Sequence, residues 1–351
     1  MQAVVLMGGE ATRLRPLTWG LPKAMLPVLN IPFLAHLLNY LQKQGVSDII
    51  LALGFQSPFI EDYLAPSQLP VRVRCITETS PLGTAGAVRN LSPYVEQSFF
   101  VLNGDIFTDL DLKDMLQFHR QRRSKLTIAL TPVADPSSFG VVNTDEHSRV
   151  TSFVEKPSPG TETTKNINAG VYLLEAETLR GISPGHSMFE RGLFPDLVCS
   201  GEPVFGYTYS GYFIDIGTPE NYLKLNHDLL HRQGEKTASL PGVELQGPVL
   251  LGRGVIVEPG AELYGPTVLG PGCHIGAGSV IAGSVLWEGA RMGLNVRVPE
   301  SVIAAHSLVG DGCHLERCVL GSGCQLPPGQ RLEPGTRVKG SELKPQLQPS
   351  S

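Results

Sequence analysis

An apolar residue at every sixth position dominates the last third of the chain. The series starts near residue 242 and is unbroken over Leu245, Leu251, Val257, Leu263, Leu269, Ile275, Ile281 and Trp287. It slips after Trp287, resumes at Ile303, Val309 and Leu315, slips again, and continues through Leu320, Leu326, Leu332 and Val338. Glycine and proline crowd the intervals. A hexapeptide period is typical of a β-helix, in which each repeat supplies one short strand and a turn.

The alternative is an ordinary β-sandwich, which would show alternation with a period of two and turns about every 8–12 residues. The period of six favours the β-helix, and we predict one over residues 242–340 with roughly five coils of three strands each. The last segment, residues 341–351, is polar and contains proline. We expect it to form a flexible tail.

The first 235 residues have a different rhythm, in which short apolar runs alternate with amphipathic stretches. Val, Ile, Leu and Phe fill the runs "QAVVLM", "DIILAL", "VRVRCI", "SFFVLN" and "KLTIAL", and "FLAHLLNYLQKQG" reads as a helix that ends at glycine. This alternation predicts an α/β domain with a mostly parallel sheet over residues 1–235. Such sheets bind ligands at the carboxyl ends of their strands.

Composition excludes several classes of protein. The net charge of −5 gives no electrostatic footprint for nucleic acid, and no apolar run is long enough to span a membrane. The N-terminus lacks the pattern of a signal peptide, and the six cysteines show no C-x-x-C spacing. We therefore expect a cytoplasmic protein with buried, reduced thiols.

The first loop, within "LMGGEATRLRPLTWGLPKAMLPV", combines glycine with fixed positive charge. Backbone N–H groups beside Gly8 and Gly9 can approach phosphate oxygens because no Cβ blocks them. Arg13 adds a fork of donors suited to phosphate, and Lys23 adds a mobile point charge. A plain strand-to-helix turn with solvated charges is the alternative.

Two further segments follow predicted strands. In "ETSPLGTAGAVRNL", Gly83 and the small residues after it would let a flat base lie against the backbone, although Thr84 as a simple helix N-cap explains the segment equally well. In "FFVLNGDIFTDLD", Asp105 follows an apolar strand and would lie at the carboxyl edge of the sheet, where a Mg²⁺ carboxylate is often found. Asp109 and Asp111 compete with it, but Asp111 is better placed as the N-cap of the next helix.

Three more motifs lie further along the chain. Glu155 and Lys156 of "FVEKP" pair an acceptor for sugar hydroxyls with a cation for a phosphate monoester, and Asn168 and Gly170 of "NINAGVYLL" could line the same pocket. A surface ion pair beside an ordinary turn is the alternative for these residues. Asp215 of "DIGTPENY" follows another strand and could complete a Mg²⁺ site with Asp105.

The segment after Asp215 predicts a helix with Thr218 as N-cap and Pro219 at its first position. Within that helix, His227 and His231 are four residues apart and resemble a zinc-binding pair. No third ligand is apparent, so we interpret the two histidines as part of a solvated helix face.

Together these motifs resemble the sugar-1-phosphate nucleotidyltransferases, also called nucleotide-sugar pyrophosphorylases. The loop "GGEATRLRPLT" with "PKAMLPV" is similar to their signature, and "LGTAGA", "NGD", "FVEKP", "NAGVY" and "DIGTPENY" follow in the family's order. The resemblance spans residues 1 to about 230, and a left-handed β-helix is common after the catalytic domain in this family. Within the family, "ETSPLGTAGA" is most similar to mannose-1-phosphate guanylyltransferases.

The resemblance implies Mg²⁺-dependent transfer of a nucleotidyl group from an NTP to a sugar 1-phosphate, with GTP and mannose 1-phosphate as the expected pair. It implies that Arg13, Lys23, Asp105 and Asp215 are catalytic and that the two aspartates hold the metal. Nucleotide contacts would come from these two basic residues and from Leu6, Gly8, Gly9, Gly83 and Thr84. Sugar phosphate contacts would come from Gly140, Glu155, Lys156, Asn168 and Gly170.

Adenylyl, thymidylyl or uridylyl transfer to a glucose phosphate remains an alternative, as does a catalytically silent subunit that binds nucleotide sugars. The β-helix is expected to mediate assembly into a dimer to tetramer, and no nucleic acid or membrane partner is expected for the protein. One residue departs from the family signature, because Ala11 replaces a glycine. We expect Ala11 to have a negative φ, since alanine is strained when φ is positive.

Overall fold

The computed structural model describes residues 1–54, 57–67, 69–158, 160–234 and 240–340, so the tail predicted for residues 341–351 lies outside the described residues. The chain folds into two compact units. Unit 1 comprises Met1–Gly9 and His36–Asp215, and unit 2 comprises Glu10–Ala35 and the chain from Ile216 onward. The segment Glu10–Ala35 therefore groups with the C-terminal part of the chain, although it directly follows the first strand.

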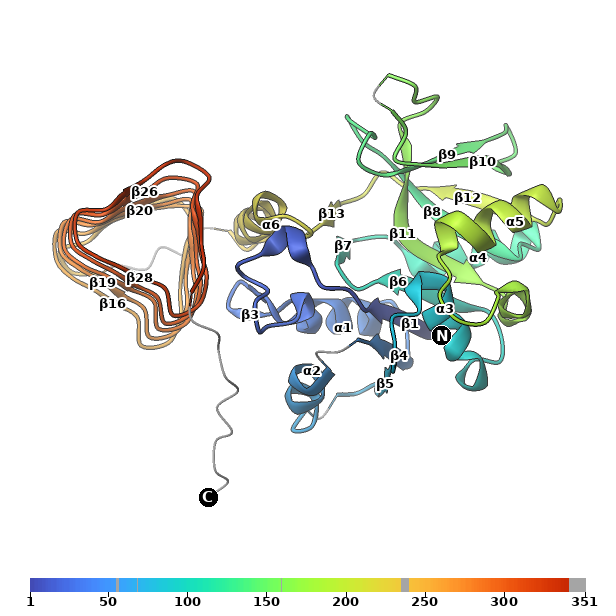
Figure 1. Ribbon diagram of the computed structural model, residues 1–351, viewed down its shortest axis with the longest axis horizontal. Helices are drawn as coiled ribbons and strands as arrows, with labels where there is room; N and C mark the ends of the chain where they lie inside the picture. Colours follow the sequence, from blue (N-terminus) through green and yellow to red (C-terminus); the bar gives the residue numbers. More distant parts are fainter. Residues whose placement is uncertain (55–56, 68, 159, 235–239, 341–351) are drawn as a thin grey trace. The chain divides into compact units, whose positions relative to one another are not determined.

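Unit 1 is built on a nine-stranded mixed sheet (Figure 1). Four neighbouring strands are parallel and lie in the order β6 (Phe99–Asn103), β1 (Gln2–Met7), β4 (Asp48–Leu53) and β5 (Arg72–Thr77). The other half, mostly antiparallel, contains β8 (Leu126–Pro132), β9 (Gly140–Thr144), β10 (Val150–Glu155), β11 (Asn166–Leu174) and β12 (Val204–Thr208). A separate pair joins β7 (Ile106–Thr108) to β13 (Phe213–Asp215). The sheet is thus a Rossmann-like mixed sheet, and the parallel strands that the alternation predicts include β6, β1, β4 and β5.

The helices of unit 1 present apolar faces to this sheet, and the core residues of the central strands are almost fully buried. The helical segments are α1 (Phe33–Lys43), α2 (Ser57–Leu64), α3 (Gly83–Asn90), α4 (Leu112–Arg122), α5 (Phe194–Cys199) and the short turns η3 (Ser92–Tyr94), η4 (Ala176–Gly181) and η5 (Phe189–Leu193). Asp111 caps α4, as predicted, by accepting hydrogen bonds from the amides of Lys113 at 2.8 Å and Asp114 at 3.1 Å.

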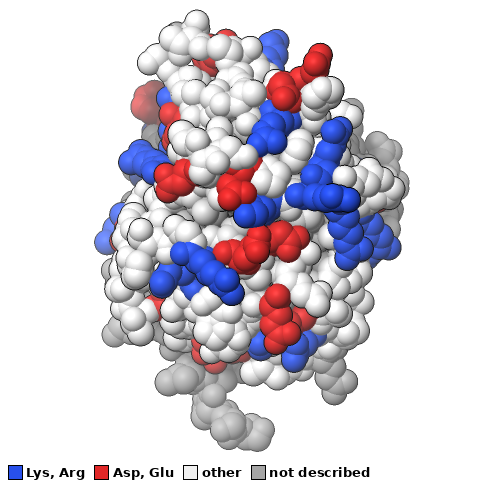
Figure 2. Space-filling view, turned by 90° about the vertical axis from the view of Figure 1, so that its right-hand side faces the viewer, with Lys and Arg blue, Asp and Glu red and all other residues white. Residues whose placement is uncertain are grey.

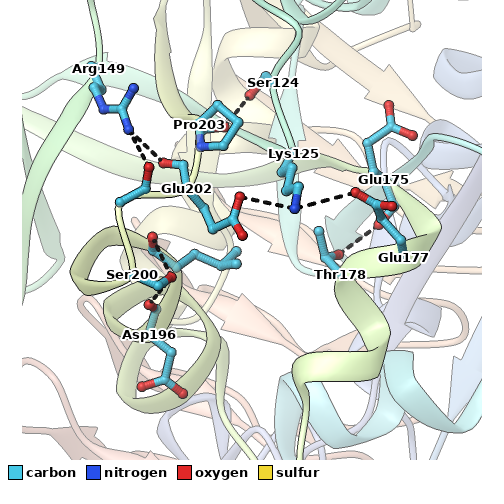
Figure 3. A network of polar contacts seen from close by, with 12 residues as sticks. Ser124, Lys125, Arg149, Glu175, Glu177, Thr178, Asp196, Ser200, Glu202 and Pro203 are labelled. Atoms are coloured by element: carbon cyan, nitrogen blue, oxygen red, sulfur yellow. Dashed lines mark hydrogen bonds and ion pairs between the residues drawn. The ribbon is translucent and has the colours of Figure 1, made fainter.

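A polar network ties the start of β8 to the start of β12 (Figure 3). Lys125 Nζ lies 3.0 Å from Glu202 Oε2 and 3.5 Å from Glu177 Oε1, and Ser124 Oγ donates to the Pro203 carbonyl at 3.1 Å. From β9–β10 the Arg149 guanidinium donates to the Gly201 carbonyl at 2.6 Å. This network closes the edge of the sheet with side chains that have no part in the candidate site.

Acidic and basic side chains are intermixed on the face of the molecule drawn in Figure 2. No large area of one sign covers that face, in agreement with the small net charge of −5. Among the helices of the described residues, none has both the length and the apolar character needed to cross a bilayer.

The C-terminal part of unit 2 is a triangular solenoid with three flat faces (Figure 1). Its strands form parallel sheets of six, six and five. The first sheet contains β14 (Glu244–Gln246), β17 (Glu262–Tyr264), β20 (Val280–Ala282), β23 (Arg297–Pro299), β26 (His314–Leu315) and β29 (Arg331–Leu332). The second contains β15 (Val249–Leu251), β18 (Thr267–Leu269), β21 (Val285–Leu286), β24 (Val302–Ile303), β27 (Val319–Leu320) and β30 (Arg337–Val338). The third contains β16 (Ile256–Val257), β19 (His274–Ile275), β22 (Arg291–Met292), β25 (Leu308–Val309) and β28 (Gln325–Leu326).

The apolar residues of the hexapeptide series fill the interior of this solenoid, which is consistent with a left-handed β-helix. One position of the predicted series, Trp287, was wrong. The register pairs Leu269 with Leu286, so Leu286 occupies the interior position that the period assigns to Trp287. The coil shortens from 18 residues, between Leu263 and Ile281, to 17 residues, between Ile281 and Val298. Trp287 is also buried, but its indole N–H donates to the Tyr222 hydroxyl at 2.9 Å.

The cysteines are all free thiols, but the prediction that all are buried was wrong. Cys273, Cys313, Cys318 and Cys324 are buried in the β-helix, whereas Cys199 is exposed and Cys75 half-buried. Burial raises the pKa of the Cys273 thiol to about 11, which keeps it protonated and unreactive near neutral pH.

Candidate active site

Gly8, Gly9 and the Asn-Gly-Asp turn lie at the same edge of the sheet in unit 1. Strands β1 and β6 are parallel, with Leu6 paired to Asn103. The amide of Gly104 donates to the Leu6 carbonyl at 2.8 Å, which holds the turn against the end of β1. Gly8 and Gly9, just beyond Leu6, are exposed to solvent. Their amides are therefore accessible to a ligand at the carboxyl ends of these strands.

Asp105 and Asp215 approach one another through the pairing of β7 with β13. Asp215 is paired with Ile106, the residue directly after Asp105, and both aspartates are half-buried. Two carboxylates on adjacent strands fit Mg²⁺, which is commonly bound by one or two carboxylates together with waters and substrate phosphates. Within the described residues, no cluster of three or more Asp, Glu, His or Cys side chains forms a fuller metal cage.

The two acidic competitors of Asp105 have structural partners. Asp109 Oδ1 accepts a hydrogen bond from the Tyr212 amide at 2.6 Å, and Asp111 caps α4. These contacts give both carboxylates a structural role that needs no ligand.

Glu155 lies against Gly140 on neighbouring antiparallel strands. The two residues are directly paired, and a Cβ added to Gly140 would lie 2.8 Å from Glu155 Oε2 and 2.5 Å from the Phe153 ring. Lys156 is exposed, with its Nζ 3.9 Å from Glu155 Oε1, and its φ of 47° lies in the left-handed region. The lack of a side chain at residue 140 therefore makes room for the carboxylate of Glu155.

Asn168 and Gly170 form a tight turn within β11. Asn168 Oδ1 accepts from the Gly170 amide at 2.9 Å, and its Nδ2 donates to the Tyr172 hydroxyl at 2.8 Å. Burial raises the pKa of Tyr172 well above its usual range, and the nearby carboxylates of Glu190, Glu155 and Asp105 raise it further. Carboxylates from three segments of unit 1 therefore act on one phenol.

The "LGTAGA" segment begins α3 two residues earlier than an N-cap at Thr84 would place it. Helix α3 starts at Gly83, and no side chain caps it. Thr84 Oγ1 instead accepts from the Phe189 amide at 3.0 Å and contacts Glu190 Oε2 at 3.4 Å. Gly83 has a φ of 70°, and a Cβ there would lie 2.5 Å from the Ser187 carbonyl oxygen. The N-cap alternative for Thr84 was wrong, and glycine is required at residue 83.

Two carboxylates near these residues were missed at the level of sequence. Glu78 Oε1 would lie 3.1 Å from a Cβ on Gly8, and Glu78 Oε2 accepts from the Leu82 amide at 3.2 Å. Glu190 lies in η5, a π-helical turn, and burial raises the pKa of its carboxyl. The π-helical turn was not visible in the sequence, whereas Glu78 stands in the quoted segment "ETSPLGTAGA" and could have been found there.

Arg13 and Lys23 belong to unit 2. Arg13 lies in the turn η1 (Thr12–Leu14) and is exposed, and Lys23 opens the turn η2 (Lys23–Met25) and is half-buried. The short strands β2 (Pro27–Val28) and β3 (Ile31–Pro32) follow in the same segment. The helix α6 (Pro219–Arg232) packs in the same unit, with Thr218 as its N-cap and Pro219 at its first position, as predicted.

The expectation for Ala11 was wrong, because this residue has φ 45° and ψ 45°. Its carbonyl accepts from the Leu14 amide at 3.1 Å and from Thr18 Oγ1 at 3.0 Å, so the loop holds it in the left-handed conformation. Alanine pays about 1–2 kcal/mol in that region, which glycine avoids. The loop therefore holds alanine in a conformation that glycine would adopt without this strain.

The interpretation of the two α6 histidines as a solvated face was wrong for His227. Its Nε2 donates to the Gly283 carbonyl of the β-helix at 3.0 Å, whereas His231 is exposed. Burial lowers the pKa of His227, so the neutral ring that makes this hydrogen bond is favoured. His227 therefore serves to pack α6 on the β-helix.

We expect Ala11→Gly to raise the free energy of unfolding by about 0.5–1 kcal/mol, because the relief of left-handed strain exceeds the added entropy of glycine in the unfolded chain. Urea denaturation of both proteins measures this. Ala35→Gly within α1 serves as the control and should destabilise by about 1 kcal/mol. A loss of stability in Ala11→Gly as large as that of the control would contradict the strain at residue 11.

Two protein-family models match this chain. The nucleotidyl transferase family model matches residues 2–232, and the GMPPB C-terminal domain model matches residues 245–339. The chain therefore belongs to the nucleotidyl transferase family and is a nucleotidyltransferase with a C-terminal β-helix, which confirms the family that the motifs indicate.

Among its relatives, a mannose-1-phosphate guanylyltransferase of Mycobacterium tuberculosis is 36% identical over 83% of this chain and 81% of its own. A probable mannose-1-phosphate guanylyltransferase 1 of Oryza sativa subsp. japonica is 33% identical over 99% of both chains. A crystal structure of HddC from Yersinia pseudotuberculosis complexed with GMP-PN matches with a TM-score of 0.58 and 33% identity, over 65% of this chain and 99% of that one.

Proposed function

We propose that this protein transfers a guanylyl group from GTP to mannose 1-phosphate and releases pyrophosphate. The observation that carries the proposal is the carboxylate of Glu78, which lies beside Gly8 and binds the amide of Leu82 in the segment that leads into α3. The names of the relatives from Mycobacterium and rice support the same pair of substrates.

The choice of base follows from the chemistry of Glu78. Guanine presents two neighbouring donors, N1–H and the exocyclic amine, and a carboxylate can accept both. Adenine has no N1–H, and the N3–H of thymine or uracil lies between two carbonyl acceptors that would face a negative charge. A carboxylate at this edge therefore favours guanine over the bases of the adenylyl, thymidylyl and uridylyl alternatives.

The reaction requires no protein nucleophile. An oxygen of the sugar phosphate attacks the α-phosphorus in line, a new P–O bond forms, and the bond to the β-phosphate oxygen breaks to release pyrophosphate. Arg13 and Lys23 bind the nucleotide phosphates and offset the negative charge that develops at the leaving group. Positioning of the two substrates accounts for the rest of the rate enhancement.

Asp105 and Asp215 would hold the Mg²⁺ ion. When bound there, the ion polarises phosphoryl oxygens as a Lewis acid. Asp215 ends β13 and Asp105 directly precedes β7, so the β7–β13 pairing brings these two half-buried residues to the same end of the strand pair.

Glu155, Asn168 and Gly140 are proposed to line the sugar pocket, with Lys156 on the sugar phosphate. The Glu155 carboxylate is a suitable acceptor for two hydroxyl groups, and the exposed Lys156 ammonium is a suitable partner for a phosphate monoester. Gly170 contributes close backbone packing behind Asn103 rather than a direct contact.

Glu78→Gln should lower kcat/KM for GTP about 30-fold, because the amide offers one acceptor and a donor where guanine needs two acceptors. Activity with UTP or dTTP should rise relative to GTP. Steady-state kinetics with the four nucleotides measure both effects, and Glu96→Gln, at an exposed acidic residue, serves as the control. Unchanged selectivity in Glu78→Gln would show that Glu78 does not read the base.

The function itself is tested with a matrix of purified protein, four NTPs, and mannose and glucose 1-phosphates, scored by pyrophosphate release. The greatest activity is expected with GTP and mannose 1-phosphate. Activity with another pair would move the protein to a different member of the family, and no activity with any pair would favour a silent nucleotide-sugar-binding subunit.

We further propose that residues 1–235 form the catalytic domain, that residues 242–340 form the β-helix domain, and that the protein acts in the cytoplasm. The long β-helix offers flat parallel sheets suited to assembly as a dimer to tetramer. Analytical ultracentrifugation would measure the assembly state, and a monomer at micromolar concentration would contradict it.

A further inference from the structure

The segment that carries Arg13 and Lys23 is held by the C-terminal part of the chain. Residues Glu10–Ala35 lie between β1 and most of α1 in sequence, yet they form one compact unit with α6 and the β-helix. The contacts that hold this segment come from residues that are 195 to 324 positions away in the sequence. Two anchors can be distinguished, one on each side of Lys23.

The first anchor is Arg337 in β30, the last strand of the β-helix. Its Nη1 donates to the carbonyl oxygen of Arg13 at 2.6 Å and lies 3.3 Å from that of Arg15. One guanidinium thus joins two carbonyls of the turn η1. The neighbouring Lys339 places its Nζ 5.0 Å from the centre of the Trp19 ring, which adds a cation–π contact to the same part of the loop.

The second anchor is a buried polar network on α6. The Tyr222 hydroxyl donates to the Pro27 carbonyl and accepts from Trp287 Nε1 of the β-helix at 2.9 Å. Asn226, which is fully buried, accepts from the Leu29 amide at 2.9 Å. Burial raises the pKa of Tyr222 beyond its usual range, so the phenol keeps the proton that it donates.

The two anchors differ in exposure. Tyr222 and Trp287 are buried in the core, whereas 41% of the Arg337 side chain is exposed. Replacing Arg337 therefore removes two hydrogen bonds to the loop without opening a cavity in the solenoid. The β28 and β29 coil beneath it retains its apolar interior of Leu326 and Leu332.

We infer that Arg337 is a positioning residue for the nucleotide phosphates, because it fixes the backbone of the turn from which the Arg13 side chain extends. This inference rests on the proposed function, in which Arg13 binds those phosphates. It gives the β-helix a part in substrate binding, through the position of Arg13, in addition to any part in assembly.

Arg337→Met tests the inference, because methionine keeps an unbranched side chain and loses the donors. We expect the KM for GTP to rise about tenfold, while the KM for mannose 1-phosphate changes less than twofold. Arg337→Lys, with one ammonium able to reach a carbonyl, should recover part of the loss. Arg331→Met, an exposed residue of the adjacent strand β29, is the matched control and should resemble the wild type in both constants.

Amide hydrogen exchange supplies a readout that does not depend on activity. Residues 12–17 should exchange faster in Arg337→Met than in the wild type, and at the wild-type rate in Arg331→Met. If Arg337→Met matches Arg331→Met in the KM for GTP and in exchange, the inference is overturned. If the wild type is inactive with every substrate pair, the proposed function fails. If amide exchange of residues 12–17 is unchanged in Arg337→Met, the contact between Arg337 and the turn is refuted independently of the function.

Discussion

Asp105→Asn is expected to lower kcat on the order of a thousandfold or more, with the fold intact. The amide has the shape of the carboxylate but no negative charge, so the site loses half of the charge that Asp105 and Asp215 together provide for Mg²⁺. Because Asp105 is half-buried in a turn at the surface of the sheet, the substitution leaves the core unchanged. Pyrophosphate release at saturating substrates measures the loss.

The matched control for this prediction is Asp114→Asn, which makes the same change at an exposed residue in the first turn of α4. It should retain wild-type turnover. Circular dichroism and the Tm of both variants establish that they fold. Turnover near the wild-type rate in Asp105→Asn would show that this carboxylate does not hold the metal.

Gly170→Ala is expected to lower the free energy of unfolding by about 3 kcal/mol or more, and to abolish most activity. Gly170 has a φ of 64°, and a Cβ there would lie 2.2 Å from Ile106 Cδ1 and 2.7 Å from Asn103 Nδ2. Both neighbours flank the Asn-Gly-Asp turn, so the methyl group would displace the segment that carries Asp105. Urea denaturation measures the stability, and the same assay measures the activity.

Gly160→Ala separates the two causes of this effect. Gly160 also has a positive φ, of 84°, but nothing lies within 4 Å of an added Cβ. This control should cost only the backbone strain, about 1–2 kcal/mol. If Gly170→Ala costs no more than Gly160→Ala, the close packing behind Asn103 is not a constraint on the site.

The architecture of both halves could be predicted from the sequence because it depends on local periodicity. The six-residue period placed the interior residues of nearly all coils, since each repeat contributes the same strand and turn. The exception at Leu286 has a tertiary cause. Trp287 is as apolar as its neighbours, but it packs at 6.3 Å against the Tyr222 ring, and no local pattern distinguishes an interior residue from one that binds a helix outside the coil.

The candidate site could be predicted only in part, for a related reason. The order of motifs indicated Asp105, Glu155 and Asn168, and the strand pairings bring these residues to one part of unit 1. The conformation of Ala11 was predicted incorrectly, because φ at that residue is determined by hydrogen bonds to its carbonyl from Leu14 and Thr18. The identity of a residue does not by itself reveal a torsion angle that is fixed by such contacts.

The hydrogen bond between Arg337 and the Arg13 carbonyl also implies an order of events during synthesis of the chain. Its two residues are 324 positions apart, and a ribosome adding about 5–20 residues per second needs roughly 15–65 seconds to cover that distance. During that interval the strands of the sheet can pair. Arg337 has not yet been synthesised, so it cannot bind the loop that begins at Glu10. A nascent chain is therefore expected to reach its full nucleotide affinity only when the last coil has left the exit tunnel, so that incomplete chains bind GTP more weakly than the finished protein.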